Sequence, residues 1–202
     1  EHAAAQLLPL KCGVAYQFEI EVESDSEATL EIKLSTSLDS RNYTPDRLIE
    51  SLAKPLQIGI QKVVFEFSGL LEENHYAQLS FHAKASVRIR LSNRLQSGTI
   101  SVFNVGNKAV SNNGAQNPPE GIGFESFEFW RPLRRPDGKN IAMNIVPAIE
   151  PYHPDLLKNG STRPFSSGNC WVSCMEDFHP KVHVKWKSPV SVKRVYLHFD
   201  TD

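Results

Sequence analysis

The sequence predicts an all-β protein made of one complete β-sandwich and the beginning of a second. Three observations lead to this fold class. Apolar and polar residues alternate with a period of two along much of the chain, clusters of Gly, Asn, Pro and Ser separate the alternating stretches, and a helical pattern occurs in one short segment only. We place the first domain at residues 1–136 and the second, incomplete domain at residues 137–202.

The first two strands are predicted at residues 14–23 and 28–34. In the first stretch, apolar residues alternate with one glutamine and three glutamates, and the second stretch repeats the alternation after a Ser-Asp-Ser turn. An apolar side and a charged side at this period mean that each strand buries one face and exposes the other to water. We expect the two strands to pair with each other, antiparallel.

The helical signal lies at residues 44–52. Thr44 can cap the N-terminus, Pro45 suits the first helical position, and three aliphatic residues share one face, namely Leu48, Ile49 and Leu52. We expect about two turns of helix here, as an excursion between strands.

More strands are predicted at residues 63–67, 77–91, 98–104 and 125–130. Because residues 77–91 are too many for one ordinary strand, we expect a tight turn near residues 83–86 to divide them into a hairpin. The loop between residues 104 and 123 is rich in Asn, Gly and Pro, and it is either a functional loop or a plain surface excursion. Prolines and arginines in residues 131–138 predict a stiff linker that ends the first domain.

The second domain is predicted to open with a strand at residues 141–149 and a turn with one helical twist at residues 151–157. Valines and Trp186 then alternate with lysines and a histidine over residues 181–187, and a Ser-Pro turn leads into residues 190–199. We expect strands in both stretches, with Trp186 in the core because it occupies an apolar position.

Composition excludes several functional classes. The net charge of −1 gives no general attraction to nucleic acid or anionic membranes, and no apolar run approaches the roughly 18 residues needed to span a bilayer. Phosphate-binding, dinucleotide-binding and hydrolase motifs are missing, so we expect neither a catalytic residue nor an organic cofactor within this chain. Three cysteines are too few for a disulfide framework, which leaves the compartment open, with a secreted or periplasmic one favoured.

Glycan binding is the function that the residues favour. Sugar recognition needs an aromatic platform beside hydrogen-bonding side chains, and two pairs offer this combination: Trp130 with Arg131, and Trp171 with Asn169. Trp130 is out of phase with the two phenylalanines before it, so we expect its ring on the exposed side of its strand. Core packing is the alternative interpretation for each ring.

A calcium site is the second candidate. Asp155, Asn159 and Thr162 surround an Asn-Gly turn that would present carboxylate, carboxamide and carbonyl oxygens, which are the ligands that calcium prefers. A plain Asn-Gly turn without metal is the alternative.

Two stretches carry resemblances to known folds. The segments LKCGVAYQF at residues 10–18, GIQKVVF at 59–65 and GTISV at 98–102 give residues 7–103 a resemblance to a jelly-roll carbohydrate-binding module. Residues 141–202 resemble the start of a galactose-binding-like sandwich of the discoidin type, in which a turn ending in Asp-Gly precedes a tryptophan strand. Here the turn reads KNG, a departure that weakens the implied calcium-supporting role of this loop.

A third resemblance concerns the parent protein. The segments NGSTRP at residues 159–164, NCWV at 169–172 and LHFDTD at 197–202 are similar to the C-terminal accessory region of bacterial FAD-dependent oxidoreductases. It implies that the FAD-binding and catalytic residues would lie upstream of Glu1. We therefore expect a non-catalytic, glycan-binding accessory region of a larger FAD-dependent oxidoreductase or carbohydrate-active enzyme. The alternative is a structural domain that packs on the missing catalytic domain, or on a second copy, and binds nothing small.

Overall fold

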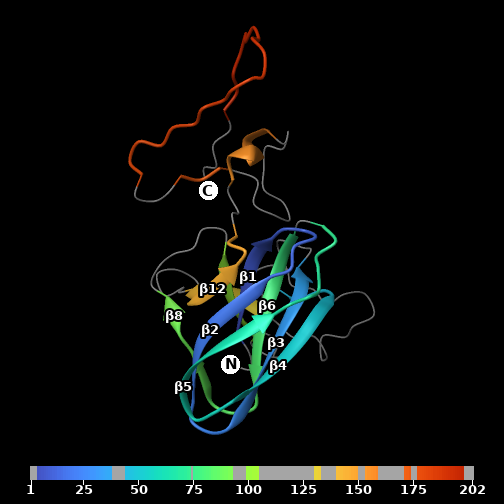
Figure 1. The fold of residues 1–202 in the computed structure, drawn as a ribbon, viewed down its shortest axis with the longest axis vertical. Coiled ribbons are helices and arrows are strands. Elements are labelled where there is room, and N and C mark those ends of the chain that lie inside the picture. The colour runs from blue at the N-terminus through green and yellow to red at the C-terminus, as the bar shows by residue number, and fades with distance from the viewer. Residues whose placement is uncertain are drawn as a thin grey trace.

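A computed structural model of the chain describes residues 4–37, 44–73, 75–92, 99–104, 130–132, 140–149, 153–158, 171–173 and 177–197. Within these residues the protein is all-β, as predicted, with antiparallel strands followed by one short 3-10 helix, η1 (Pro154–Lys158). Figure 1 shows the labelled strands gathered into one body, with η1 beyond them.

The larger sheet has six strands in the order β10, β9, β1, β6, β3, β4, and every pair of neighbours is antiparallel. Its members are β1 (Ala4–Leu10), β3 (Ala28–Ser37), β4 (Leu48–Leu56), β6 (His75–Ala83), β9 (Ile100–Asn104) and β10 (Trp130–Pro132).

The smaller sheet is built around β2 (Gln17–Ser24). β5 (Gly59–Glu66) pairs along one side of β2, while β7 (Val87–Ile89) and β12 (Met143–Val146) share its other side. A two-stranded ladder joins β8 (Leu91–Ser92) to β11 (Asn140–Ile141).

The two sheets pack face to face over one core. The buried cluster takes alternate residues from both sheets, such as Phe18, Ile20 and Phe65 of the smaller sheet with Ile32 and Leu79 of the larger. Such interdigitation of two inner faces defines a β-sandwich, so this part of the prediction is confirmed. The chain passes from one sheet to the other at most of its turns, as expected of a jelly roll.

Two pairings differ from the prediction for this reason. β2 and β3 do not pair with each other, because the turn at residues 25–27 carries the chain across to the opposite sheet. Their apolar sides therefore face each other through the core. β6 and β7 are separated near residues 84–86 as expected, but they also belong to different sheets and form no hairpin.

The helix predicted at residues 44–52 is wrong, because Leu48 begins strand β4. This strand pairs with β3 in eight registered residue pairs, with a bulge between Leu34 and Ser35. A two-turn helix is marginal on its own in water, whereas a long sheet neighbour satisfies the backbone along the whole segment. Pro55 is tolerated because, among the described strands, β4 lies at the edge of its sheet and makes ladder hydrogen bonds on one side only.

Strand β1 carries no clear alternation in the sequence because both of its faces are buried. Leu8 and Leu10 lie in the core between the sheets, whereas Ala5 and Leu7 pack into a second apolar cluster on the outer side of the larger sheet. A strand that is covered on both faces needs no polar side, which removes the signal that marks β2.

The predicted domain boundary places residues 140–146 in the second domain, but they pair with the sandwich. β11 pairs with β8, β12 pairs with β2, and Ile141 and Ile145 are part of the core. In the described residues beyond Val146 there is no strand. The strand predicted at residues 181–187 is therefore not formed, nor is the described part, residues 190–197, of the strand predicted at residues 190–199. The second sandwich stays a prediction.

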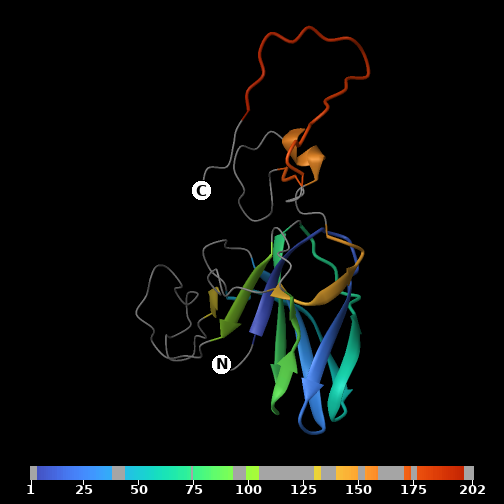
Figure 2. The same cartoon turned by 90° about the vertical axis from the view of Figure 1, so that its left-hand side faces the viewer.

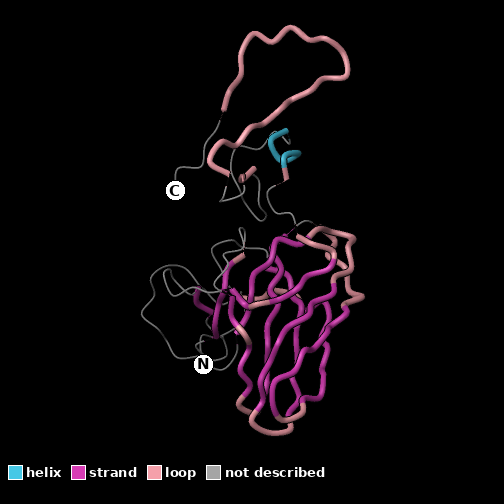
Figure 3. Tube along the Cα trace, turned by 60° about the vertical axis from the view of Figure 1, so that its left-hand side comes forward, coloured by secondary structure: helices cyan, strands magenta, loops and turns pink. Residues whose placement is uncertain are grey.

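Residues 177–197 lie apart from the strands in both side views (Figures 2 and 3). Every one of these residues is exposed to solvent, and none has a described strand beside it. Alternation alone has therefore not produced a strand here.

Candidate ligand-binding face

The outer side of the larger sheet presents a group of polar side chains that we call the outer polar cluster, made of Glu31, Lys33, Ser51, Ser80 and His82. Sheet geometry explains how they meet. Along β3, Ile32 points into the core and its two neighbours therefore point outward, and the same alternation places Ser80 and His82 outward on β6. Cross-strand register then sets Glu31 opposite His82, and Lys33 between Ser80 and Ser51.

Hydrogen bonds and one ion pair link these residues. The Ser51 hydroxyl donates to Glu31 Oε1 at 2.7 Å, and Lys33 Nζ lies 3.5 Å from Glu31 Oε2. On the next strand, the Ser80 hydroxyl and His82 Nε2 are hydrogen-bonded at 2.8 Å. These contacts form two groups, one of Ser51, Glu31 and Lys33 and the other of Ser80 and His82.

Electrostatics keep the central carboxylate ionised. The pKa of Glu31 lies below its usual value, chiefly because Ser51 donates to the carboxylate, with partial burial opposing and the charges of Lys33 and His82 assisting. The side chains of Lys33 and Glu31 are 36% and 40% exposed, so a ligand in solution can reach them. The face therefore offers a fixed anionic acceptor beside a cationic donor.

Ser80 and His82 are close enough to exchange a proton, which raises the question of nucleophilic catalysis. Acyl transfer also needs backbone or side-chain donors aimed at the developing oxyanion. β6 is paired with β1 on one side and β3 on the other, so its backbone N–H groups are engaged within the sheet. The geometry suits hydrogen bonding to a ligand better than it suits a nucleophile with an oxyanion hole.

The other half of the same face is apolar and closed. Ala5, Leu7, Val102 and Trp130 form a buried cluster there, with Tyr76 partly buried against it. Trp130 is only 2% exposed, so the prediction of an exposed stacking ring is wrong. Its strand places it at the level of Asn104, next to the apolar residues of β9 and β1, where it fills space instead of meeting solvent.

The other predicted ligand-binding residues are not brought together by the described structure. Arg131 follows Trp130 in β10, opposite Phe103. Trp171 is partly buried and lies outside any strand, and Asn169 falls outside the described residues.

For the calcium site, only Asp155 is described. It is exposed in η1, and its carboxylate lies 3.4 Å from His153 Nδ1. Asn159 and Thr162 fall outside the described residues, as do Cys170 and Cys174. Within the described part of the chain, no three His, Cys, Asp or Glu side chains gather as metal ligands would. Calcium binding stays a prediction.

The outer polar cluster was not predicted from the sequence. The sequence does contain one sign of the cluster: its members on β3 and β6 occupy the polar positions of two stretches in which apolar and polar residues alternate. The sequence does not reveal that β3 and β6, separated by about forty residues, are neighbours. Ser51 could not be placed beside them either, because the sequence predicts a helix at residues 44–52 where the structure has strand β4.

Comparison with known proteins adds no relative. No protein-family model, curated protein or solved structure matches this chain. The resemblances to carbohydrate-binding modules, discoidin-type domains and the accessory region of FAD-dependent oxidoreductases therefore stay predictions. In the described part of the chain, no helix combines the length and the apolar character needed to cross a membrane.

Proposed function

We propose that the sandwich is a non-catalytic glycan-binding module, and that sugar hydroxyls bind at the outer polar cluster. The observation that carries this proposal is the accessible Glu31 carboxylate on a sheet face, which accepts a hydrogen bond from Ser51 and forms an ion pair with Lys33. A carboxylate can accept hydrogen bonds from two hydroxyls, and an ammonium group donates to others. A β-sheet fixes the spacing of these groups, so little side-chain entropy is lost when a sugar binds.

The same proposal places the module beside a larger enzyme. An accessory domain that holds a carbohydrate near an active site needs only weak affinity, and a few hydrogen bonds without a stacking ring give dissociation constants of the order of millimolar to micromolar. The FAD-dependent oxidoreductase and the carbohydrate-active enzyme both remain candidates for that parent protein.

A glycan array probed with the purified chain, with and without calcium, tests the proposal. We expect a selective hit. Against that sugar, Glu31→Gln should weaken binding about tenfold or more, because a charge-assisted hydrogen bond contributes roughly 1.5–3 kcal/mol. The matched control is Glu21→Gln, which removes a similar carboxylate on the outer side of the smaller sheet.

The outcomes separate clearly. Loss in Glu31→Gln with unchanged affinity in Glu21→Gln supports the proposed face, provided that both variants keep the melting temperature of the parent. A blank array from folded protein would overturn glycan binding. Equal losses in the two variants would place the sugar elsewhere.

A further inference from the structure

Residues 177–197, which we call the C-terminal arm, expose an apolar stripe. Val182, Val184 and Trp186 are 45%, 54% and 56% exposed, and they occupy every second position. The residues between them are His183 and Lys185, and a lysine flanks the stretch on each side. Exposed apolar surface of this kind marks an interaction site in a folded protein, and its period of two is that of a strand with one buried face.

The arm also differs in charge from the rest of the chain. It holds five lysine or arginine residues and one aspartate, which gives a net charge of +4 with neutral histidines. Because the whole chain carries −1, the remaining residues carry −5. Residues 1–149, which contain the sandwich, hold 17 Asp or Glu and 15 Lys or Arg and so carry −2 of this charge. The sandwich part of a second copy would therefore attract the arm, and screening by salt should weaken that modest attraction.

One edge of the sandwich is suited to receive a strand. In the described structure β5 pairs only with β2, so its other side offers a row of unpaired backbone groups along eight residues. Two large apolar side chains lie exposed where it begins, Ile58 at 70% and Ile60 at 71%. The other edges of the larger sheet suit this role less, because β4 contains Pro55 and β10 spans three residues.

We propose that residues 181–187 of one copy pair with the free edge of β5 in a second copy. Because each chain carries one arm and one β5 edge, reciprocal exchange closes a twofold dimer. Strand addition of this kind draws its affinity from main-chain hydrogen bonds and its register from alternate side chains. The inference goes beyond glycan binding, and self-association can be measured without any sugar.

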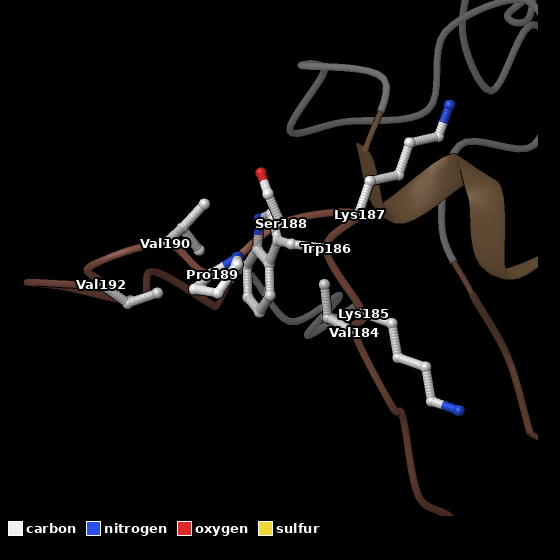
Figure 4. A pocket seen from close by; sticks show the side chains of 8 residues that line it. All are labelled: Val184, Lys185, Trp186, Lys187, Ser188, Pro189, Val190 and Val192. Carbon is white, nitrogen blue, oxygen red and sulfur yellow. The ribbon is translucent and has the colours of Figure 1, made fainter.

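The arm bends at Lys187 and Ser188, and the residues on both sides of the bend form a pocket that could hold a side chain. Val184 and Trp186 before the bend, with Pro189, Val190 and Val192 after it, line an open pocket of about 440 Å³ (Figure 4). Apolar walls of this kind fit the exposed side chain of an isoleucine. In the dimer, Ile60 of the second copy would enter this pocket.

Sedimentation velocity of the full chain from about 1 to 100 μM tests the proposal over the range of weak dimers. We expect a monomer–dimer equilibrium that weakens in high salt. Val184→Pro removes a backbone donor and should shift the equilibrium at least tenfold toward monomer. Val195→Pro, the same kind of change at an exposed residue of the arm beyond the pocket, is the matched control and should leave the equilibrium unchanged.

A second variant examines the receiving edge. Ile60→Lys places a cation on exposed β5, where it repels the lysines of the arm without disturbing the core, and it should also favour monomer. A chain that stays monomeric across the whole range would overturn the proposal. So would a dimer that Val184→Pro and Ile60→Lys leave intact, equal losses in Val195→Pro, or hydrogen exchange showing a protected arm in the monomer.

Discussion

Two stretches of the chain have the same binary pattern and opposite fates. β2 alternates apolar residues with glutamates, and the C-terminal arm alternates valines and Trp186 with lysines. In β2 the apolar residues Phe18, Ile20 and Val22 are buried, whereas their counterparts in the arm are about half exposed. Intrinsic preference for a strand is therefore not what separates them.

The difference between β2 and the arm lies in their neighbouring strands. β2 has hydrogen-bonded strands on both sides, and cations from these neighbours meet its glutamates: Lys62 Nζ lies 3.2 Å from Glu19, and Arg90 lies 2.8 Å from Glu21. In the described structure the arm has no strand beside it. An alternating sequence becomes a strand only when another strand completes its ladder and its charged face is solvated or neutralised.

The largest predicted effect compares the same substitution in the two stretches. Val22→Ala in β2 removes two buried methyl groups from the core and should lower the free energy of unfolding by about 2–3 kcal/mol. Val184→Ala in the arm removes mostly exposed groups and should change it by less than about 0.5 kcal/mol. Urea denaturation followed by tryptophan fluorescence at submicromolar protein, where a weak dimer dissociates, gives both values.

This pair can fail in an informative way. If Val184→Ala costs as much as Val22→Ala at submicromolar concentration, the arm is packed within the monomer. The distinction between the two stretches would then be lost.

The second prediction concerns what ties the later part of the chain to the sandwich. Gln6 is buried in β1, where its side-chain oxygen accepts hydrogen bonds from the Ile141 backbone N–H at 3.0 Å and from the Ser101 hydroxyl at 3.2 Å. Its amide nitrogen donates to Asn140 Oδ1 at 3.3 Å. Gln6→Ala should cost roughly 1–2 kcal/mol, because it leaves a buried N–H without its acceptor.

Gln61→Ala is the control for Gln6→Ala. Gln61 also makes two side-chain hydrogen bonds to the backbone, both to Gln57, but on an exposed turn where water can replace them. Its loss should stay below about 0.5 kcal/mol. Equal costs in urea titrations would show that β11 is not held to the sandwich through Gln6.

The sequence predicts much of this fold and little of its connectivity. Alternation identifies β2, β3, β5 and β6, because each shows a largely apolar side opposite a more polar one, and β9 is predicted as well although apolar residues lie on both of its sides. Alternation does not distinguish a β2 that pairs with β3 in one sheet from a β2 that faces β3 across the core, because both arrangements bury the same residues. It misses β1, which is apolar on both faces, and it mistakes β4 for a helix because Thr44 and Pro45 imitate a helix start.

The candidate site shows the same limit. Polar positions of β3 and β6 are visible in the sequence, but their meeting depends on strand order between segments that are distant in the chain. Trp130 illustrates the reverse case. The sequence treats one side of its strand as core and the other as solvent, whereas the outer side of the larger sheet carries a second apolar cluster that buries the ring.

The smallest predicted effect examines the charges around β2. Arg88 holds Asp25 with two hydrogen bonds, at 2.6 and 2.9 Å, and also contacts Glu23 at 3.1 Å. The hydrogen bond from Arg88 is the main cause of a pKa of Asp25 below its usual value, with partial burial opposing. A lowered pKa in the folded state gives stabilisation that is present above the ordinary aspartate pKa of about 3.9 and is lost as the pH falls through the folded value.

Melting temperatures from pH 6 to pH 2 measure this contribution. Asp25→Asn should flatten the acid limb of the curve slightly, because the protein then loses no stabilisation when this position would be protonated. The effect should be small, since exposed ion pairs contribute little. In an Arg88→Met background, Asp25→Asn should change nothing further, because the partner that lowers the pKa is gone. An acid limb that is flattened equally with and without Arg88 would show that Arg88 does not stabilise the ionised Asp25, and would leave Lys62 and Arg90 as the cations that neutralise the charged face of β2.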